Sequence, residues 1–153
     1  MNGDGKEKGL LLVCLGNEHR GDDAVGLFIA RHLKNMGLKD DDVLEAGMNL
    51  VGHISKIEEI SPSSILIVDA AKMGLKPGEW KIIDVSEIQN KGLSTHENNF
   101  PVFISYMNFR HPEISIRFLG IQVASTELSD SMTLSSEVKR GALALIGIIG
   151  SRL

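Results

Sequence analysis

The chain has 153 residues, of which 42% are hydrophobic and 24% are charged, and its formal net charge is -4. This composition is typical of a globular domain with a sizeable core and excludes a disordered polymer. The acidic balance, with no run of Lys and Arg, argues against nucleic acid or an anionic membrane as the main partner. The single cysteine, Cys14, excludes an internal disulfide and is expected to be an inert core thiol.

The two ends of the chain give no sign of targeting to a membrane. Residues 1–9 are rich in Gly and charge and lack the apolar core of a signal peptide, so we expect a flexible N-terminal tail. The longest apolar stretch, Ala142 to Ile149, is too short to span a bilayer. We therefore expect one domain over residues 10–153, a cytoplasmic location and no membrane insertion.

The segment from Leu10 to Gly26 organises the rest of the chain. Leu10 to Leu15 are six apolar residues typical of a buried strand, and Gly16-Asn17 ends it. After a short polar loop, Asp22 and Asp23 precede a helical pattern that begins at Val25. Asp22 could cap that helix, and Asp23 suits its positive end. Alternatively, the acids lie where a strand's carboxyl end meets a helix, which is where open α/β sheets bind ligands.

Strand and helix patterns mostly alternate along the remainder of the chain. The expected elements are, in order, a strand at Val43–Ala46, a helix at Asn49–Ile60, a strand at Ile65–Val68, a strand at Trp80–Val85, a helix at Phe100–Asn108, a strand at Ile114–Val123 and a helix from Ser135 or Ser136. The connection before Trp80 is too short for a crossover helix, so that strand should run antiparallel to its predecessor. The order predicts a three-layer α/β/α sandwich with a mostly parallel five-stranded sheet and one antiparallel strand.

Two further residues have functional and structural interpretations. Asp69 follows four aliphatic residues, so it either sits at the carboxyl edge of the sheet or caps the next turn. His96 precedes a predicted helix in a polar loop, where a histidine is usually only solvated. If the first and third strands are neighbours, Asp23 and Asp69 come together at the switch point of the sheet. Two carboxylates and an imidazole suit a divalent first-row metal, and both nickel and zinc accept that set.

Several common catalytic signatures are missing from the sequence. There is no Cys-x-x-Cys, His-Glu-x-x-His or Gly-x-Ser-x-Gly, and no Gly-x-Gly-x-x-Gly follows the first strand. Common zinc sites, a nucleophile-elbow hydrolase and a dinucleotide site are therefore disfavoured. From the residues alone, the chain is either a metal-dependent hydrolase or a metal-binding α/β protein.

Four sequence blocks resemble the nickel–iron hydrogenase maturation endopeptidases, especially the hydrogenase-3-type branch. The blocks are Gly16-Asn17-x-x-x-Gly21-Asp22-Asp23-x-x-Gly26, Val68-Asp69-Ala70-Ala71-Lys72-Met73-Gly74-Leu75-Lys76-Pro77-Gly78-Glu79, Ser94-Thr95-His96 with Asn99-Phe100-Pro101, and Phe118-Leu119-Gly120-Ile121-Gln122. They lie in family order and span nearly all of the chain after the tail. Each is modest alone, but four in order are specific.

The resemblance implies an aspartyl-type endopeptidase of the cytoplasm that removes the C-terminal extension of a hydrogenase large-subunit precursor. It implies that cleavage follows nickel insertion and falls after a basic residue beyond the last cysteine motif. The family's metal-binding and catalytic positions carry over to Asp23, Asp69 and His96. The expected metal is nickel, held by the enzyme or brought by the substrate, and other divalent metals can replace it. The family fold is likewise an α/β/α sandwich with one antiparallel strand.

The sequence departs from the family pattern at a few positions. Ala24 stands where relatives often have Gly, and a tight helix start accepts either. The segment Gly47, Met48 and Asn49 replaces a common Gly-Gly-Thr or Gly-Gly-Ser, and we expect this loop to bind substrate. His19 could be an extra ligand, although a solvated loop histidine is the simpler interpretation.

The sequence leaves one question of mechanism open and raises two rival functions. Either the bound metal polarises the scissile carbonyl, or nickel in the precursor is the recognition element and an acid is the general base; we favour the second. A peptidyl-tRNA hydrolase is disfavoured, because it would need Pro where Glu18 stands and a His-Asn pair soon after, and the acidic balance of the chain suits tRNA poorly. A non-catalytic nickel-binding or chaperone-like relative would use the same ligands. We expect a monomer whose partner is the nickel-loaded precursor.

Overall fold

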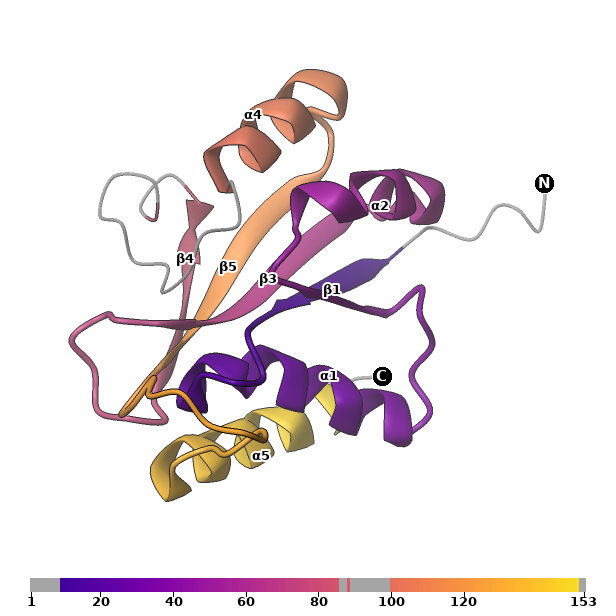
Figure 1. The fold of residues 1–153 in the computed structure, drawn as a ribbon. Coiled ribbons are helices and arrows are strands. Elements are labelled where there is room, and N and C mark those ends of the chain that lie inside the picture. The colour runs from indigo at the N-terminus through magenta and orange to yellow at the C-terminus, as the bar shows by residue number, and fades with distance from the viewer. Residues whose placement is uncertain (1–8, 86–87, 89–99, 152–153) are drawn as a thin grey trace.

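The computed structural model describes residues 9–85, 88 and 100–151. Its five strands form one sheet with the order β2-β1-β3-β5-β4 (Figure 1). The strands are β1 Leu10–Leu15, β2 Val43–Gly47, β3 Ser64–Ala71, β4 Trp80–Asp84 and β5 Ser115–Gln122. The helices are α1 Val25–Asn35, α2 Ile54–Ile60, α4 Phe100–Arg110 and α5 Ser136–Ser151, with short 3-10 helices η1 Gly21–Ala24 and η2 Val51–His53. His96 and residues 1–8 of the predicted tail lie outside the described residues.

The sheet is mixed, as the sequence predicts. β1 pairs in parallel with β2 and β3, and β3 pairs in parallel with β5. β4 is the antiparallel strand, and it pairs with β5 rather than with β3, which precedes it in the chain. Residues 72–79 therefore carry the chain past β5 to the edge of the sheet, so the reversal is wider than a hairpin.

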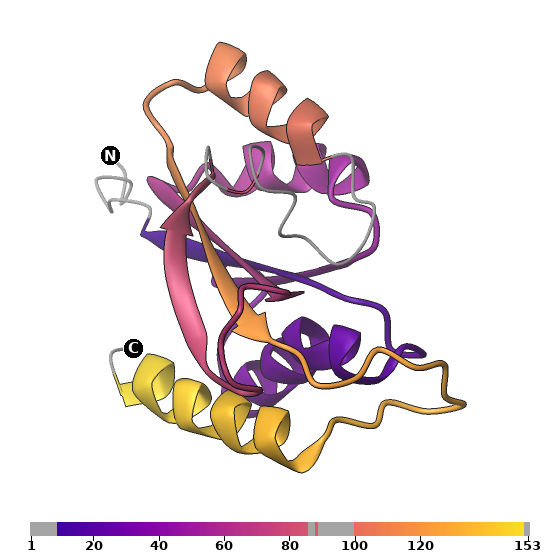
Figure 2. The same cartoon turned by 90° about the vertical axis from the view of Figure 1, so that its left-hand side faces the viewer.

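Helices cover both faces of the sheet in three layers. α1 and α5 lie side by side on one face, and α2 and α4 lie on the other (Figures 1 and 2). Successive side chains of a strand point to opposite faces, so Leu11 and Val13 of β1 pack with α2 and α4. Leu12 and Cys14 pack with α1 and α5. The continuous apolar run of β1 thus reflects burial on both faces, and the predicted α/β/α sandwich is confirmed.

The predicted boundaries differ from the observed ones at a few ends. β3 continues to Ala71, three residues beyond the predicted end at Val68, because Asp69, Ala70 and Ala71 still pair with β5. The helix expected over Asn49–Ile60 is η2 followed by α2. Among the helices of the described residues, none is both long and apolar enough to cross a membrane.

Candidate active site at the carboxyl edge of β1 and β3

The order of the strands places a topological switch point between β1 and β3. From β1 the chain crosses over α1 to β2 on one side, and from β2 it returns over α2 to β3 on the other side of β1. The chain therefore leaves the carboxyl end of β1 toward β2, and it leaves the carboxyl end of β3 in the opposite direction, toward β4 and β5. Opposite exits from neighbouring strands open a crevice at that edge. Both acids predicted for the site belong to this region.

Asp69 lies one residue beyond the point where β1 stops pairing with β3. The last β1–β3 pair is Cys14 with Val68, whereas Asp69 still pairs with Gly120 of β5. The prediction that Asp69 ends its strand is therefore wrong, because β5 extends the ladder past β1. The side chain is fully buried, and the backbone N–H of Ala70 donates to its Oδ1 at 2.7 Å. Asp69 thus lies inside a strand, one residue past the last β1–β3 pair, and the pairing with β5 fixes its backbone.

Asp23 reaches the same edge because the start of α1 packs closely on both strands. It belongs to η1 and is 2% exposed. At Gly26 a Cβ would lie only 2.1 Å from the Leu15 carbonyl oxygen and 2.8 Å from that of Val68, so only glycine allows this approach. The first turn of α1 therefore touches the residue before Asp69. The structure thus places Asp23 and Asp69 on adjoining elements at one edge.

Asp22 has a different role from its neighbour. Its Oδ2 accepts hydrogen bonds from the backbone N–H groups of Ala124 at 2.8 Å and Ser125 at 2.9 Å. Its Oδ1 accepts from the N–H of Ser135 at 2.7 Å, and the Ser135 hydroxyl lies 2.8 Å from Oδ2. The expectation that Asp22 caps the helix after it is wrong, because its carboxylate binds the loop after β5 and the residue before α5. Asp22 holds η1 to that loop.

The residues in place suit a divalent cation in their chemistry. Asp23 and Asp69 are both nearly or fully buried, and paired carboxylates are oxygen donors that first-row divalent ions accept. Within the described part of the chain, no three His, Cys, Asp or Glu side chains form a group that could hold a metal ion. A third protein ligand would have to come from elsewhere, and the predicted one, His96, is not among the described residues.

A cleft of about 320 Å³ opens beside Asp23. Residues 16–19 form one wall, residues 45–48 form the other, and Leu27 and Arg31 of α1 complete it. Gly16 links the cleft to the acids, because its N–H donates to the Gly47 carbonyl at 3.0 Å and a Cβ on it would lie 2.6 Å from the Asp23 carbonyl oxygen. The cleft and the candidate site therefore share one backbone segment.

Of the three residues predicted to bind substrate, two line this cleft. Gly47 and Met48 lie on its wall, and Met48 is 55% exposed. Asn49 does not line it, because its side-chain oxygen accepts a hydrogen bond from the Gly52 N–H at 3.0 Å at the start of η2. The positive φ of Gly47, 60°, turns the chain away from β2 at this point.

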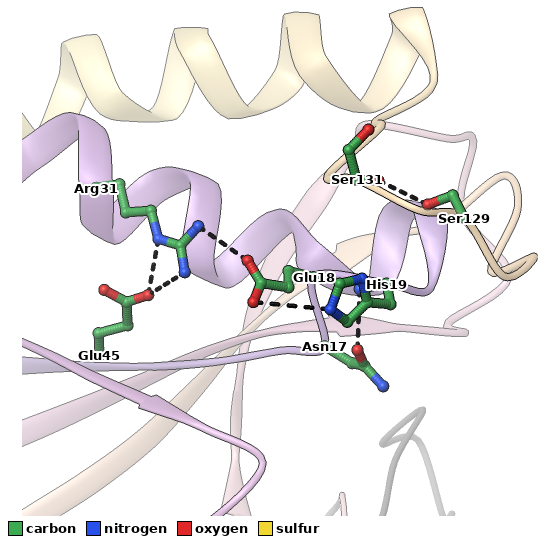
Figure 3. Close-up of polar contacts among 7 residues, drawn as sticks. All are labelled: Asn17, Glu18, His19, Arg31, Glu45, Ser129 and Ser131. Carbon is green, nitrogen blue, oxygen red and sulfur yellow. Dashed lines mark hydrogen bonds and ion pairs between the residues drawn. The ribbon is translucent and has the colours of Figure 1, made fainter.

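A network of charged residues crosses the cleft (Figure 3). Arg31 donates from Nε to Glu45 Oε1 at 2.8 Å, and its Nη1 lies 3.4 Å from Glu18 Oε2. The hydrogen bond to Glu45 is the main reason that the pKa of Arg31 is held above its usual range. His19 lies beside Glu18 with a side chain that is 59% exposed, which supports the interpretation as a solvated loop histidine.

Arg31 and Glu45 line the cleft but were not predicted from the sequence as residues of the site. Glu45 pairs in register with Cys14, and a bulge between this pair and the next, Leu15 with Gly47, lies at the mouth of the cleft. A signal was present, because Glu45 interrupts an apolar strand one residue from its predicted carboxyl end. Arg31 gave no such signal, since a charged residue on the exposed side of a helix is ordinary.

Comparison with known proteins identifies the family. A model of the hydrogenase maturation protease family, HycI, matches residues 28–151. The hydrogenase 3 maturation protease of Escherichia coli K12 is 34% identical over 112 residues, which are 73% of this chain and 71% of that protein. The chain therefore belongs to the hydrogenase maturation protease family. It is a protease that acts in hydrogenase maturation, as the resemblance implied.

Solved structures support the same assignment. The NiFe hydrogenase maturation protease HycI of Thermococcus kodakarensis KOD1 superimposes with a TM-score of 0.80 at 29% identity, over 96% of this chain and 93% of that one. The NiFe hydrogenase maturation protease HybD of Thermococcus kodakarensis gives a TM-score of 0.74 at 29% identity, over 94% of this chain and 97% of that one. The fold read from the sequence is thus that of the family.

Proposed function

We propose that this protease removes the C-terminal extension of a nickel–iron hydrogenase large-subunit precursor after nickel has been inserted. The observation that supports the proposal best is the pair of buried carboxylates, Asp23 and Asp69, at the switch point beside a cleft. Burial makes such a pair costly for the fold, so a use in binding or catalysis explains why it stands where ligands bind in α/β sheets.

In this proposal the nickel belongs to the substrate and is the feature that the enzyme recognises. Asp23 and Asp69 supply oxygen donors for it, and His96 is the third ligand predicted from the sequence. A divalent ion at these residues would polarise a nearby carbonyl. The chain's own contribution is to orient the scissile peptide and to accept a proton from the attacking water on one of the two carboxylates.

The cleft beside Asp23 provides the surface for the precursor. Its walls at residues 16–19 and 45–48 are continuous with the backbone that contacts Asp23, so a peptide held there would run next to the segment that carries this acid. Met48 offers an exposed apolar side chain to the precursor. The proposal includes the predicted cytoplasmic location and monomeric state.

The test is intact-mass spectrometry of a nickel-loaded precursor after incubation with the enzyme. We expect the loss of one C-terminal peptide, whose mass gives the cleavage site, and no loss from nickel-free precursor. Asp69→Asn and Asp23→Asn should each lower the rate by at least about a hundredfold, as expected for loss of a general base. His96→Ala should do the same if the predicted ligand set is correct.

The matched control is Asp40→Asn, which removes an acid whose side chain is 74% exposed. It should cut at the wild-type rate. Circular dichroism of each variant separates lost chemistry from lost folding. An unprocessed precursor with confirmed nickel loading would contradict the proposal for that hydrogenase, and cleavage of nickel-free precursor at the same rate would remove nickel from the recognition step.

A further inference from the structure

We propose that Arg31 is a positioning residue that holds the two walls of the cleft together for binding of the precursor. This inference rests on the proposed function, because it assigns the cleft to the substrate. Arg31 lies on α1, Glu18 on the loop after β1 and Glu45 on β2, so three separate elements meet at one guanidinium (Figure 3). None of these side chains belongs to the proposed catalytic pair.

The contacts of Arg31 differ in strength on the two walls. Both Nε and Nη2 reach the same oxygen, Glu45 Oε1, at 2.8 and 2.7 Å. Nη1 reaches Glu18 Oε2 at the longer distance of 3.4 Å. A planar guanidinium can serve two carboxylates at once, which a lysine ammonium on a flexible stem does less well. The wall at residues 45–48 is thus held firmly, and the wall at residues 16–19 is held more loosely.

The charges explain why the cleft needs this residue. Glu18 and Glu45 are two carboxylates on opposite walls, and like charges facing each other repel. Among the basic side chains of the described residues, Arg31 is the one that contacts both. Without its charge the loop at residues 16–19 is pushed away from β2, and a peptide has to close the walls again when it binds. Loss of the Arg31 charge should therefore raise KM and leave kcat nearly unchanged.

A purely structural ion pair on the surface would behave differently. The side chains of Arg31 and Glu18 are each 45% exposed and that of Glu45 is 27% exposed, so the pairs contribute little to the stability of the fold. The same helix provides a matched comparison, because Lys34 forms an ion pair with Asp40 at 3.3 Å away from the cleft residues. Lys34→Gln removes one positive charge and one ion pair from α1, whereas Arg31→Gln removes one positive charge and the two ion pairs that cross the cleft.

The experiment measures kcat and KM for cleavage of the nickel-loaded precursor by five proteins. These are the wild type, Arg31→Gln, Arg31→Lys, the double variant Arg31→Gln with Glu18→Gln, and Lys34→Gln. We expect Arg31→Gln to raise KM about fivefold, which corresponds to an exposed ion pair, with kcat within a factor of about two. Arg31→Lys should recover part of the loss, and the double variant should recover most of it because the repulsion is removed.

The outcomes separate this inference from the function on which it rests. If the wild type does not cut the precursor, the proposed function fails and the inference fails with it. If the wild type cuts and Arg31→Gln has the KM of Lys34→Gln, only the inference is overturned. A fall in kcat at unchanged KM, or a double variant no better than Arg31→Gln, also overturns it, because neither agrees with repulsion between the walls.

Discussion

Among the described residues, two clusters in which carboxylates meet cationic or hydroxyl partners lie at opposite edges of the sheet. Glu18, Arg31 and Glu45 lie at the carboxyl edge, beside the end of β1. Glu58 lies on α2 just before β3 begins, and His111 lies just before β5 begins, which places their cluster at the amino edge. In both clusters one charged side chain contacts two partners, so the chemistry alone does not distinguish them.

The two clusters differ in what they connect. At the amino edge, Glu58 Oε2 accepts hydrogen bonds from the Tyr106 hydroxyl at 2.9 Å and the His111 ring at 2.8 Å. These contacts tie α2 to α4 and to the residue after it. At the carboxyl edge the network crosses a cleft that shares its backbone with the segment contacting Asp23. The same residue types therefore support packing at one edge and border a binding site at the other.

The largest expected change in stability comes from Asp22, which lies at the carboxyl edge but has a structural role. Asp22→Ala should destabilise the fold by about 4 kcal/mol, since three backbone N–H groups and a hydroxyl lose a buried charged acceptor. Asp22→Asn keeps one oxygen acceptor and should cost about half as much. Urea unfolding followed by circular dichroism measures both.

The contrast with the neighbouring residue tests the assignment of roles. At a temperature where Asp22→Asn is fully folded, its cleavage of the precursor should stay near the wild-type rate, whereas Asp23→Asn should be inactive. An Asp22→Asn enzyme that is folded and inactive would show that both acids of the pair belong to the chemistry. The separation of adjacent residues into a structural and a catalytic acid would then be wrong.

A smaller effect is expected at the amino edge. Glu58→Gln should lower the midpoint of urea unfolding by less than Asp22→Ala does, because the Glu58 side chain is 29% exposed. Cleavage of the precursor should be unchanged. Glu59→Gln is the matched control, since Glu59 is the next acid on α2 and its side chain is 75% exposed in an ion pair with Lys56. Loss of activity in folded Glu58→Gln would show that the cluster at the amino edge does more than support packing.

The pH dependence of the same variant gives a second readout. The hydrogen bonds from His111 first, and then from Tyr106, hold the pKa of Glu58 below its ordinary value of 4.5. A carboxyl with a lowered pKa in the folded state stabilises the fold above the unfolded pKa, and this contribution disappears as the pH falls through the folded pKa. The stability difference between wild type and Glu58→Gln should therefore be present near neutral pH, begin to fall near pH 4.5 and disappear below the lowered pKa of Glu58 in the folded protein. A difference that persists in acid would point to packing instead.

The sequence predicted the layers of the fold better than the details of the site. Continuous apolar runs such as Leu10–Leu15 are typical of strands buried on both faces, so the pattern predicted the sandwich. Asp23 and Asp69 were predicted for the site from their places before a helix and after an apolar run, and from the family resemblance, and their role stays a prediction. The structural role of Asp22 was not predicted, because its partners Ala124 and Ser135 are more than a hundred residues away in the chain. The contacts of Arg31 likewise depend on how α1 lies against β2, which no local pattern encodes.

The smallest effect concerns Cys14, which lies under the carboxyl edge. Burial is the main cause, and Glu45 a further cause, of a pKa raised to about 12, and Asp69 also contributes. At pH 8 only about one thiol in ten thousand is then ionised, and the side chain is fully buried. Alkylation by iodoacetamide should be at least about a thousandfold slower in the native protein than in denaturing urea.

Glu45→Gln separates the two causes that act on Cys14. Because burial dominates, removing this carboxylate should raise the native alkylation rate by less than about tenfold, which is one pKa step. Mass spectrometry of the labelled chain over time measures the rate. A Glu45→Gln protein that reacts as fast as the unfolded chain would show that Glu45 keeps the edge closed over β1. Glu45 would then be needed for the packing of the carboxyl edge as well as for the charge of the cleft.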